Sequence, residues 1–206
     1  MQNNILLITF LSVLFYFIGS IPTGFIILKL FHKKDITLEG SGNVGAMNSY
    51  DVSGSKKTGI FVFILDFLKG VLPAIIPLYF LDISIDFMYI PFAALIVGHN
   101  YSIWLKFKGG RGLATAAGIF AVVNFWIVII WCVIFVIANL IKKDVHIGNI
   151  VATILMPVLL IVLNLRWHGL INFSGINSEE IIIFSSIACA LILVKHISPF
   201  LSLIKR

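Results

Sequence analysis

The sequence predicts an all-α integral membrane protein. Of its 206 residues, 60% are hydrophobic and 12% are charged, which is far from the composition of a soluble domain. Several apolar runs reach the length of about 20 residues that an α-helix needs to cross a bilayer. The first run lacks the basic start and the small-residue cleavage site of a signal peptide. We therefore expect a single membrane-embedded domain over residues 1–206.

Six apolar segments define the predicted helices. They cover residues 5–31, 58–81, 87–105, 112–140, 147–165 and 180–203. The fourth segment is too long for one upright helix, and Val122, Val123 and Asn124 can form a turn within it. We expect a short or re-entrant helix over residues 112–121, followed by a separate helix over residues 125–140.

The distribution of basic residues favours this division. With seven helices, the basic stretches fall on one side of the membrane, and only Arg166 lies in a loop on the other side. These stretches are residues 33–57, 106–111, 142–143 and 195–206. Cytoplasmic loops carry the excess of lysine and arginine in membrane proteins. The sequence thus predicts seven transmembrane helices, an external N-terminus and a cytoplasmic C-terminus.

The net charge of +6 follows from this topology. It needs no nucleic acid as partner, because the chain offers no basic soluble face. Cys132 and Cys189 lie in separate apolar runs without C-x-x-C spacing, so we expect inert thiols in the protein core. The histidines are scattered singly, which argues against a metal site. We expect neither a metal nor another cofactor.

Two polar features interrupt the apolar helices. Residues 19–24, Gly-Ser-Ile-Pro-Thr-Gly, predict a kink in the first helix, because proline lacks an N–H donor and glycine loosens the turn. Asp66 and Lys69 are spaced i, i+3 in the second helix, so they share one face. A lone charge at that depth is costly, and a mutual ion pair or a water-filled cavity is expected. Each feature can serve helix packing or a functional site.

Residues 40–48, Gly-Ser-Gly-Asn-Val-Gly-Ala-Met-Asn, form the first glycine-rich segment. The glycines let the backbone turn tightly and expose N–H groups, while Ser41, Asn43 and Asn48 add neutral donors. Such a concave set of donors suits a phosphate. The spacing also matches the G-x-G-x-x-G motif of dinucleotide-binding folds, which requires a preceding strand in a soluble βαβ unit. Because an apolar helix precedes these glycines, we reject that interpretation.

Residues 106–112, Lys-Phe-Lys-Gly-Gly-Arg-Gly, form the second glycine-rich segment and lead into a helix. Backbone N–H groups, the helix dipole and three cations converge there. The cations by themselves are explained by the excess of basic residues in cytoplasmic loops, but membrane topology does not require the glycines between them. His99 lies just before this segment, and His146, Asn149 and His196 lie at the same predicted face of the membrane. We interpret this face as a site for a ligand with a phosphate head and a hydrocarbon tail.

In these motifs and their order, the chain resembles the bacterial acyl-phosphate:glycerol-3-phosphate acyltransferases, the PlsY family, over nearly its whole length. The matching motifs lie at residues 19–22, 40–48, 66–70, 98–99 and 106–115. The resemblance implies a seven-helix enzyme of the bacterial inner membrane with a cytoplasmic active face. It implies transfer of an acyl group from acyl phosphate to the 1-hydroxyl of glycerol 3-phosphate, which yields lysophosphatidic acid for phospholipid synthesis. A soluble enzyme that makes the acyl phosphate is the implied partner.

The resemblance also implies roles for individual residues. The residues that hold the donor phosphate are Ser41, Gly42, Asn43, Gly45 and Asn48. The residues that hold glycerol 3-phosphate are Lys106, Arg111, Asn149 and His196. Of these, Ser41, Lys106 and His196 act most directly in catalysis. Supporting residues are Asp66, Lys69, His99, Gly109, Gly110 and Gly112. Because an acyl phosphate already carries a good leaving group, the reaction needs alignment and charge stabilisation but no covalent nucleophile.

Several positions depart from the family pattern, so the chain is a divergent member. Asp51 replaces an arginine that grips the acceptor phosphate, and an aspartate repels a phosphate where an arginine attracts it. The other departures are Met47 for a threonine, Arg111 for a lysine, Gly148 and Asn149 for two serines, Pro199 for an asparagine and Ser202 for an arginine. Most of these changes concern the predicted acceptor side.

Three functions remain open. In the first, the chain has the family activity, with the acceptor held by Lys106, Arg111, Lys56 or Lys57. In the second, acyl phosphate serves a less anionic acceptor, or catalysis is lost and the role is regulatory. In the third, the chain is a small transporter or channel that uses Asp66 with Lys69. The third predicts polar residues through several helices, but polarity clusters at one face, so we rank the functions in the order given.

Overall fold

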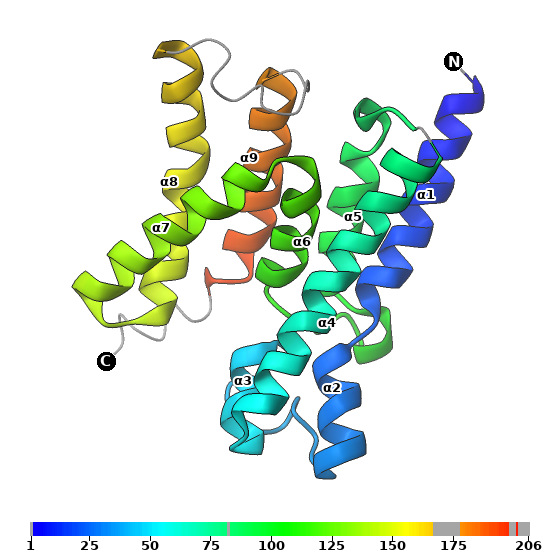
Figure 1. Cartoon of the computed structure of the whole chain (residues 1–206). Coiled ribbons are helices and arrows are strands. Elements are labelled where there is room, and N and C mark those ends of the chain that lie inside the picture. Colours follow the sequence, from blue (N-terminus) through cyan, green and yellow to red (C-terminus); the bar gives the residue numbers. More distant parts are fainter. Residues whose placement is uncertain (1, 82, 167–177, 198–200, 202–206) are drawn as a thin grey trace. The chain divides into compact units, whose positions relative to one another are not determined.

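The computed structural model describes residues 2–81, 83–166, 178–197 and 201. Every regular element in these residues is a helix or a helical turn, so the predicted all-α class is confirmed. The helices form two compact units, Met1–Ile119 and Phe120–Arg206. Figure 1 shows them coloured along the sequence.

The first helix is interrupted where the sequence predicts a kink. α1 (Gln2–Ser20) ends before Ile21 and Pro22, and the chain resumes as α2 (Thr23–Ile27) and one π-helical turn, η1 (Leu28–His32). Pro22 has no N–H to donate, so the regular helical hydrogen bonds cannot continue through it. The carbonyl oxygen of Ile21 instead accepts a hydrogen bond from Thr23 N at 3.0 Å. The break thus exposes a backbone carbonyl that other groups can reach.

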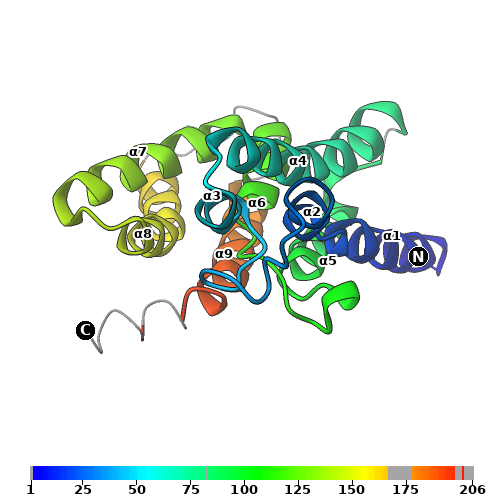
Figure 2. The same cartoon turned by 90° about the horizontal axis from the view of Figure 1, so that it is seen from below.

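α3 (Ala46–Ser53) and α4 (Lys56–Ile75) form a helical hairpin around Gly54, whose φ of +69° ends α3. Ser55 caps α4 by accepting a hydrogen bond from Thr58 N at 3.3 Å. A π-helical turn, η2 (Ile76–Phe80), prolongs α4 to a length of 25 residues. α2 and α3 lie beside the first half of α4 (Figure 2). These elements carry the first glycine-rich segment.

α5 (Tyr89–Asn100) is shorter than the sequence predicts. The predicted helix over residues 87–105 is wrong beyond Asn100, where the chain forms a loop with a 3₁₀ turn, η4 (Ile103–Leu105). Another 3₁₀ turn, η3 (Ile85–Phe87), precedes α5. At this end of the helix, Gly110 N, from the following loop, donates a hydrogen bond of 2.9 Å to the last-turn carbonyl of His99, and carbonyls of a last helical turn need such partners from outside the helix.

Glycines bring α1 and α5 into close contact along their length (Figure 1). A Cβ atom on Gly19 would overlap the carbonyl oxygen of Leu95, and one on Gly98 would overlap that of Tyr16. Such close approach of backbones is typical of helix interfaces in membranes, where van der Waals packing drives association.

A second glycine pair joins α4 to α6 (Leu113–Val123). A Cβ atom on Gly70 would overlap the carbonyl oxygen of Thr115 and lie 3.0 Å from the Cα atom of Gly118, and a Cβ atom on Gly118 would overlap the carbonyl oxygen of Phe67. The two backbones therefore touch at this crossing, with no room for a side chain on either helix.

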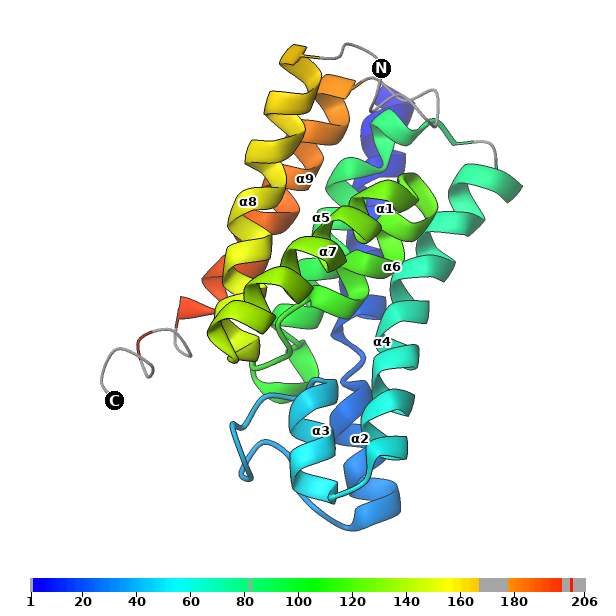
Figure 3. The same ribbon diagram turned by 60° about the vertical axis from the view of Figure 1, so that its left-hand side comes forward.

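The predicted division of residues 112–140 is confirmed. α6 ends at Val123, and α7 (Phe125–Lys142) begins directly after Asn124, whose side chain accepts a hydrogen bond from Trp126 N at 3.2 Å. Asn124 thus acts as an N-cap. α8 (Val145–Arg166) and α9 (Ser178–Val194) follow. In the second unit, α8 packs beside α9 (Figure 3) and is joined to α7 by a hydrogen bond of 3.2 Å from Trp131 Nε1 to Thr153 Oγ1.

Four segments of the described residues are long and apolar enough to cross a membrane by themselves. They are Asn4–His32, Lys56–Phe80, Phe125–Lys142 and Val145–Asn164. α6 is a shorter apolar helix, so the number of seven transmembrane helices stays a prediction. The end of the last predicted segment, beyond residue 197, lies mostly outside the described residues. One further expectation is wrong: Cys132 is exposed on α7 instead of lying in the core, whereas Cys189 is buried.

The α4–α6 crossing predicts a large effect of one methyl group. We expect Gly70→Ala to destabilise the protein by about 1–3 kcal/mol or more, because the added Cβ meets backbone that cannot yield. Gly148→Ala is the matched control, since its Cβ would meet the Phe135 ring and the Cβ atom of Asn139 at 3.1–3.3 Å, and side chains can shift. Thermal melting of both variants in detergent checks this, and equal melting temperatures would contradict the crossing.

Candidate functional site

The first glycine-rich loop, residues 40–48, comprises the end of the connection from η1 to α3 and the first three residues of α3. Gly40 and Gly42 adopt φ values of +59° and +67°, in the left-handed region that favours glycine. A Cβ atom on Gly40 would also overlap the side-chain oxygen of Asn48. The sequence therefore needs glycine at both positions for the loop to fold onto itself.

Asn48 holds this loop together from inside. Its side chain is 3% exposed. Its Oδ1 atom accepts a hydrogen bond from Ser41 N at 2.9 Å, and its Nδ2 atom donates to the carbonyl oxygens of Ile36, Glu39 and Asn43 at 3.3, 3.1 and 2.8 Å. Asn48 thus stabilises the loop, which differs from its predicted role as a direct donor to a phosphate.

The loop keeps fewer donors for a ligand than the sequence suggests. Ser41 N, Gly42 N and Gly45 N all donate within the loop, the last of them to Asn43 Oδ1 at 2.8 Å. The Ser41 side chain is exposed, and the Asn43 amide nitrogen is not used by that contact. Gly45 begins α3 without a side-chain cap, so the first N–H groups of α3 have no partner within the helix. These groups are the donors with which the loop can bind an anion.

An apolar cluster lies beneath the first loop and reaches the second. Its buried members are Leu28, Ile36, Val44 and Val52, and Phe25 and Leu105 pack against it. Leu105 directly precedes Lys106, the first residue of the second glycine-rich segment. Val44 of the first segment and Leu105, the residue before the second segment, therefore pack on the same cluster, as expected if the two segments serve one site.

A buried polar centre lies in the middle of this unit. Asp66 is 1% exposed, and its Oδ1 atom is 2.8 Å from Lys69 Nζ, so the predicted ion pair is present. Thr23 donates a hydrogen bond to the same oxygen, and Lys69 Nζ donates to the Ile21 carbonyl at 3.0 Å. His99 Nδ1 lies 3.7 Å from Asp66 Oδ1. The pair thus links α4 to the break between α1 and α2 and to the end of α5.

Thr23 and the Ile21 carbonyl are members of this centre that sequence reasoning missed. The pattern of residues 19–24 predicts the break but gives no sign that the exposed carbonyl faces a lysine. The i, i+3 spacing of Asp66 and Lys69 reports only their mutual contact. A threonine directly after the proline of a broken helix is the one signal that points to an additional donor.

The second glycine-rich loop, residues 106–112, docks on the end of α5. A Cβ atom on Gly109 would overlap the carbonyl oxygen of His99, and one on Gly110 would overlap the imidazole Nε2. Gly112 adopts a φ of +82°, and a Cβ there would lie 2.8 Å from Asn100 Oδ1. Close packing therefore explains these glycines, so their presence does not by itself indicate a ligand, contrary to what the sequence had suggested.

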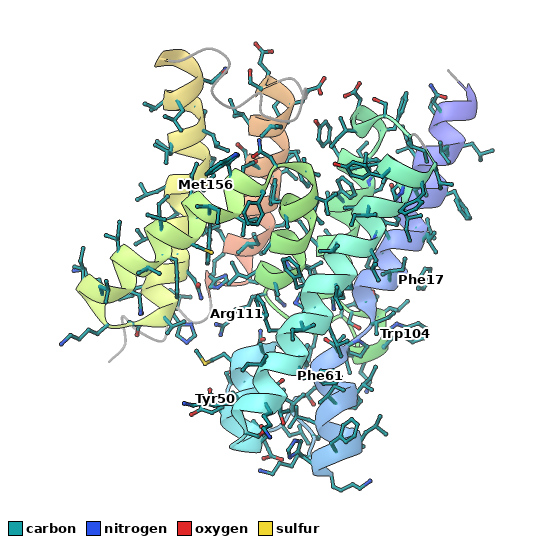
Figure 4. The ribbon with its side chains drawn as sticks, in the orientation of Figure 1. Phe17, Tyr50, Phe61, Trp104, Arg111 and Met156 are labelled. Carbon is teal, nitrogen blue, oxygen red and sulfur yellow. The ribbon has the colours of Figure 1, made fainter. Side chains whose placement is uncertain are left out.

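Three cations of this loop differ in their surroundings. Lys106 and Lys108 are exposed, and Lys106 adopts a φ of +53°. Arg111 precedes α6 (Figure 4) and is partly buried. This burial lowers the pKa of the Arg111 guanidinium, because removal from water disfavours its charged form. An anion beside Arg111 would compensate for the lost hydration.

The remaining predicted residues belong to the second unit. Asn149 is 9% exposed on α8, and His196 is 2% exposed in the turn after α9. His196 Nδ1 lies 2.9 Å from the carbonyl oxygen of Ile192, so this nitrogen carries a proton. Asp144 Oδ1 accepts hydrogen bonds from His146 N and Ile147 N at 2.7 and 3.0 Å and thereby caps α8. That Asn149 and His196 meet Ser41 and Lys106 stays a prediction.

The two asparagines of the first loop give a test of its structure. We expect Asn48→Asp to lower the stability by about 1–3 kcal/mol, because a carboxylate replaces a donor that serves buried carbonyls. Asn43→Asp keeps the acceptor for Gly45 N, so its melting temperature should stay close to that of the parent protein. The melting curves of the two variants check this. If the melting temperature of Asn48→Asp equals that of Asn43→Asp, the Asn48 side chain does not stabilise the loop.

Comparison with known proteins places these features in a family. The family model described as glycerol-3-phosphate acyltransferase matches residues 9–206. A glycerol-3-phosphate acyltransferase of Macrococcus caseolyticus is 46% identical over 147 residues, which cover 71% of this chain and 74% of the relative. One from Phytoplasma australiense is 36% identical and covers 92% of this chain and 88% of the relative.

Solved structures show the same fold. Crystal structures of PlsY (YgiH), an integral membrane glycerol 3-phosphate acyltransferase, in its glycerol 3-phosphate and lysophosphatidic acid forms, superpose with TM-scores of 0.79 and 0.78. Each is 31% identical, and the match covers 96% of this chain and 92% of the solved chain. The chain is an all-helical integral membrane protein, and it belongs to the glycerol-3-phosphate acyltransferase family.

Proposed function

We propose that this protein transfers an acyl group from acyl phosphate to the 1-hydroxyl of glycerol 3-phosphate and so forms lysophosphatidic acid. One observation carries the proposal: both glycine-rich loops adjoin the same apolar cluster, through Val44 and Leu105. The hydrogen-bond donors of the first loop and the cations of the second thus belong to one apolar helical unit. Family membership and the glycerol 3-phosphate and lysophosphatidic acid forms of the similar PlsY structures support the acceptor and the product.

The reaction needs no covalent intermediate with the protein. The 1-hydroxyl oxygen attacks the acyl carbon, an ester bond forms, and the bond between the acyl carbon and the phosphate oxygen breaks. The hydroxyl proton passes to a substrate phosphate, and inorganic phosphate leaves. Protein groups therefore serve to align the hydroxyl with the acyl carbon and to stabilise charge on the departing phosphate.

The first loop is suited to the donor phosphate. Ser41 offers its exposed hydroxyl, Asn43 its amide nitrogen, and Gly42 and Gly45 allow a phosphate to approach the backbone. The N-terminus of α3 adds a favourable dipole for an anion. Asn48 contributes by shaping this loop.

The cations of the second loop are suited to the acceptor phosphate. In this proposal Lys106 and Arg111 bind glycerol 3-phosphate, and Asn149 and His196 have the acceptor-binding roles that the family resemblance implies. Arginine offers a planar set of donors that matches a phosphate, while lysine acts as a compact charge. Ser41, Lys106 and His196 act closest to the reacting atoms.

Asp51 favours a second candidate acceptor. Its carboxylate is exposed on α3, the helix whose N-terminus belongs to the donor loop. A fixed negative charge there weakens the attraction for a dianionic acceptor. A neutral alcohol such as glycerol is therefore the alternative acceptor, with acyl phosphate as donor in both cases.

The proposed membrane placement follows from charge. Seven transmembrane helices put both glycine-rich loops on the cytoplasmic face of the bacterial inner membrane, where the basic loops belong. Acyl phosphate carries an acyl chain that partitions into the bilayer and a head that stays at its surface. A soluble enzyme that makes acyl phosphate is the proposed partner at that face.

Product formation by the purified protein tests the proposal. We expect lysophosphatidic acid from palmitoyl phosphate and glycerol 3-phosphate in nanodiscs, and none from palmitoyl-CoA. Asn43→Asp should reduce turnover by about 10²-fold or more with little change in melting temperature, because it places a negative charge beside the donor phosphate. Quantification of labelled lysophosphatidic acid measures both.

Two controls separate the alternatives. Asp86→Asn, a change at an exposed carboxylate of the η3 turn, should leave turnover unchanged. Glycerol is supplied as a competing acceptor. Product from glycerol but not from glycerol 3-phosphate would replace the proposed acceptor, and acyl transfer from palmitoyl-CoA alone would refute the proposed donor.

A further inference from the structure

We propose that His99 is a positioning residue that couples the buried Asp66–Lys69 pair to the second glycine-rich loop and thereby sets where Lys106 and Arg111 stand. The inference rests on the proposed function for the roles of Lys106 and Arg111. The contacts of His99 with the loop do not depend on the proposed function, and a spin label on the loop measures them separately from activity.

Both the backbone and the ring of His99 contact the second glycine-rich loop. Its carbonyl oxygen accepts a hydrogen bond from Gly110 N at 2.9 Å. A Cβ atom on Gly110 would overlap the imidazole Nε2, and one on Gly109 would overlap the His99 carbonyl and lie 2.7 Å from the Asn100 carbonyl. The loop therefore packs directly on the ring, with no space between them. A rotation that moves the ring further towards the loop would therefore collide with Gly110.

The other side of the ring faces a fixed charge. His99 Nδ1 lies 3.7 Å from Asp66 Oδ1, and the two side chains are 5% and 2% exposed. The carboxylate is itself held by Lys69 and Thr23. The two ring nitrogens thus face opposite partners, with the Asp66 carboxylate on one side and the loop on the other. The buried carboxylate thus lies next to this ring nitrogen and favours a ring orientation in which Nδ1 faces it.

The loop needs such support because its backbone is strained. Lys106 and Phe107 both adopt left-handed conformations, with φ values of +53° and +62°, which cost energy in residues other than glycine. Phe107 N donates to the Ser102 carbonyl at 2.8 Å, and Lys108 N donates to that of Leu105 at 3.1 Å. Contact with His99 holds the far end of the same segment. Without the ring, we expect the strain to relax and the cations to move.

A displaced cation changes substrate binding more than folding. A misplacement of about 1 Å can cost up to about 10²-fold in rate. We therefore expect His99→Ala to raise the KM for glycerol 3-phosphate by about tenfold, with a smaller change in kcat. Lys106 and Arg111 are the groups that this change is expected to displace, so the KM for acyl phosphate should change less than the KM for glycerol 3-phosphate.

A spin label measures the loop directly and needs no catalytic activity. Lys108→Cys carries the label, in a background in which Cys132→Ser and Cys189→Ala remove the two natural thiols. We expect His99→Ala and Gly110→Ala each to increase the mobility of the label in the electron paramagnetic resonance spectrum. Because both changes break one contact, the double variant should show no more mobility than the single variants.

Matched controls exclude a general loss of structure. His32 Nε2 lies 2.9 Å from Thr58 Oγ1 in the same unit, so His32→Ala removes another hydrogen-bonded imidazole, and it should leave the label unchanged. Gly54→Ala strains a left-handed backbone position of the same unit without a clash within 4 Å, so an unchanged label in this variant shows that loss of stability alone does not free the loop. If His99→Ala fails to fold, Gly110→Ala decides, since it removes none of the side chains of His99, Asp66 and Lys69.

The outcomes are distinct. A mobile label together with a raised KM for glycerol 3-phosphate supports the inference. A label that stays immobile in folded Gly110→Ala overturns it, whatever the activity. If the parent protein acylates no glycerol 3-phosphate, the proposed function fails, and the label alone still decides whether His99 holds the loop.

Discussion

The structure of the first unit depends on a charge placed where charge is expensive. Asp66 lies buried in an apolar helix and is stabilised by Lys69, one turn along the same helix, and by Thr23. Lys69 in turn satisfies the Ile21 carbonyl that the break before Pro22 exposes. The break in the helix thus provides an acceptor for Lys69 and a donor for Asp66, and Lys69 provides the exposed carbonyl with a hydrogen bond. A buried pair of this kind does little for stability by itself, but loss of either member leaves an uncompensated charge.

Glycine provides the second constraint. At Gly19 with Gly98, and at Gly70 with Gly118, the backbones of two helices touch. At Gly109 and Gly110, a loop closes on the end of α5 in the same way. Most of these glycines belong to the motifs that suggest an active site in the sequence, but in the structure they allow two backbones to pack in direct contact. Lys106 and Arg111, which are proposed to bind the acceptor, lie on the loop that this packing holds against α5.

Much of this fold follows from the sequence, because its signals are local. Pro22 predicts the kink, and i, i+3 spacing predicts the Asp66–Lys69 pair. The length of the apolar segment 112–140 and the distribution of basic residues predict the break at Asn124. What failed depends on distant contacts. The end of α5 is hydrogen-bonded to Gly110 of a later loop, whereas residues 101–105 are mostly apolar, which is typical of a continuing helix. An amide pattern also cannot tell whether Asn48 faces its own loop or a ligand. The resemblance to a known family supplied roles that spacing alone could not assign.

A double-mutant cycle on the buried pair tests this account most directly. The variants are Asp66→Asn, which keeps an acceptor for Thr23, Lys69→Met and their combination, with Lys57→Met as an exposed control. Stability is measured by unfolding in mixed micelles. We predict that each single change costs about 3–5 kcal/mol and that the double change costs clearly less than their sum. Strictly additive costs would show that the two charges do not compensate each other, and would contradict the account.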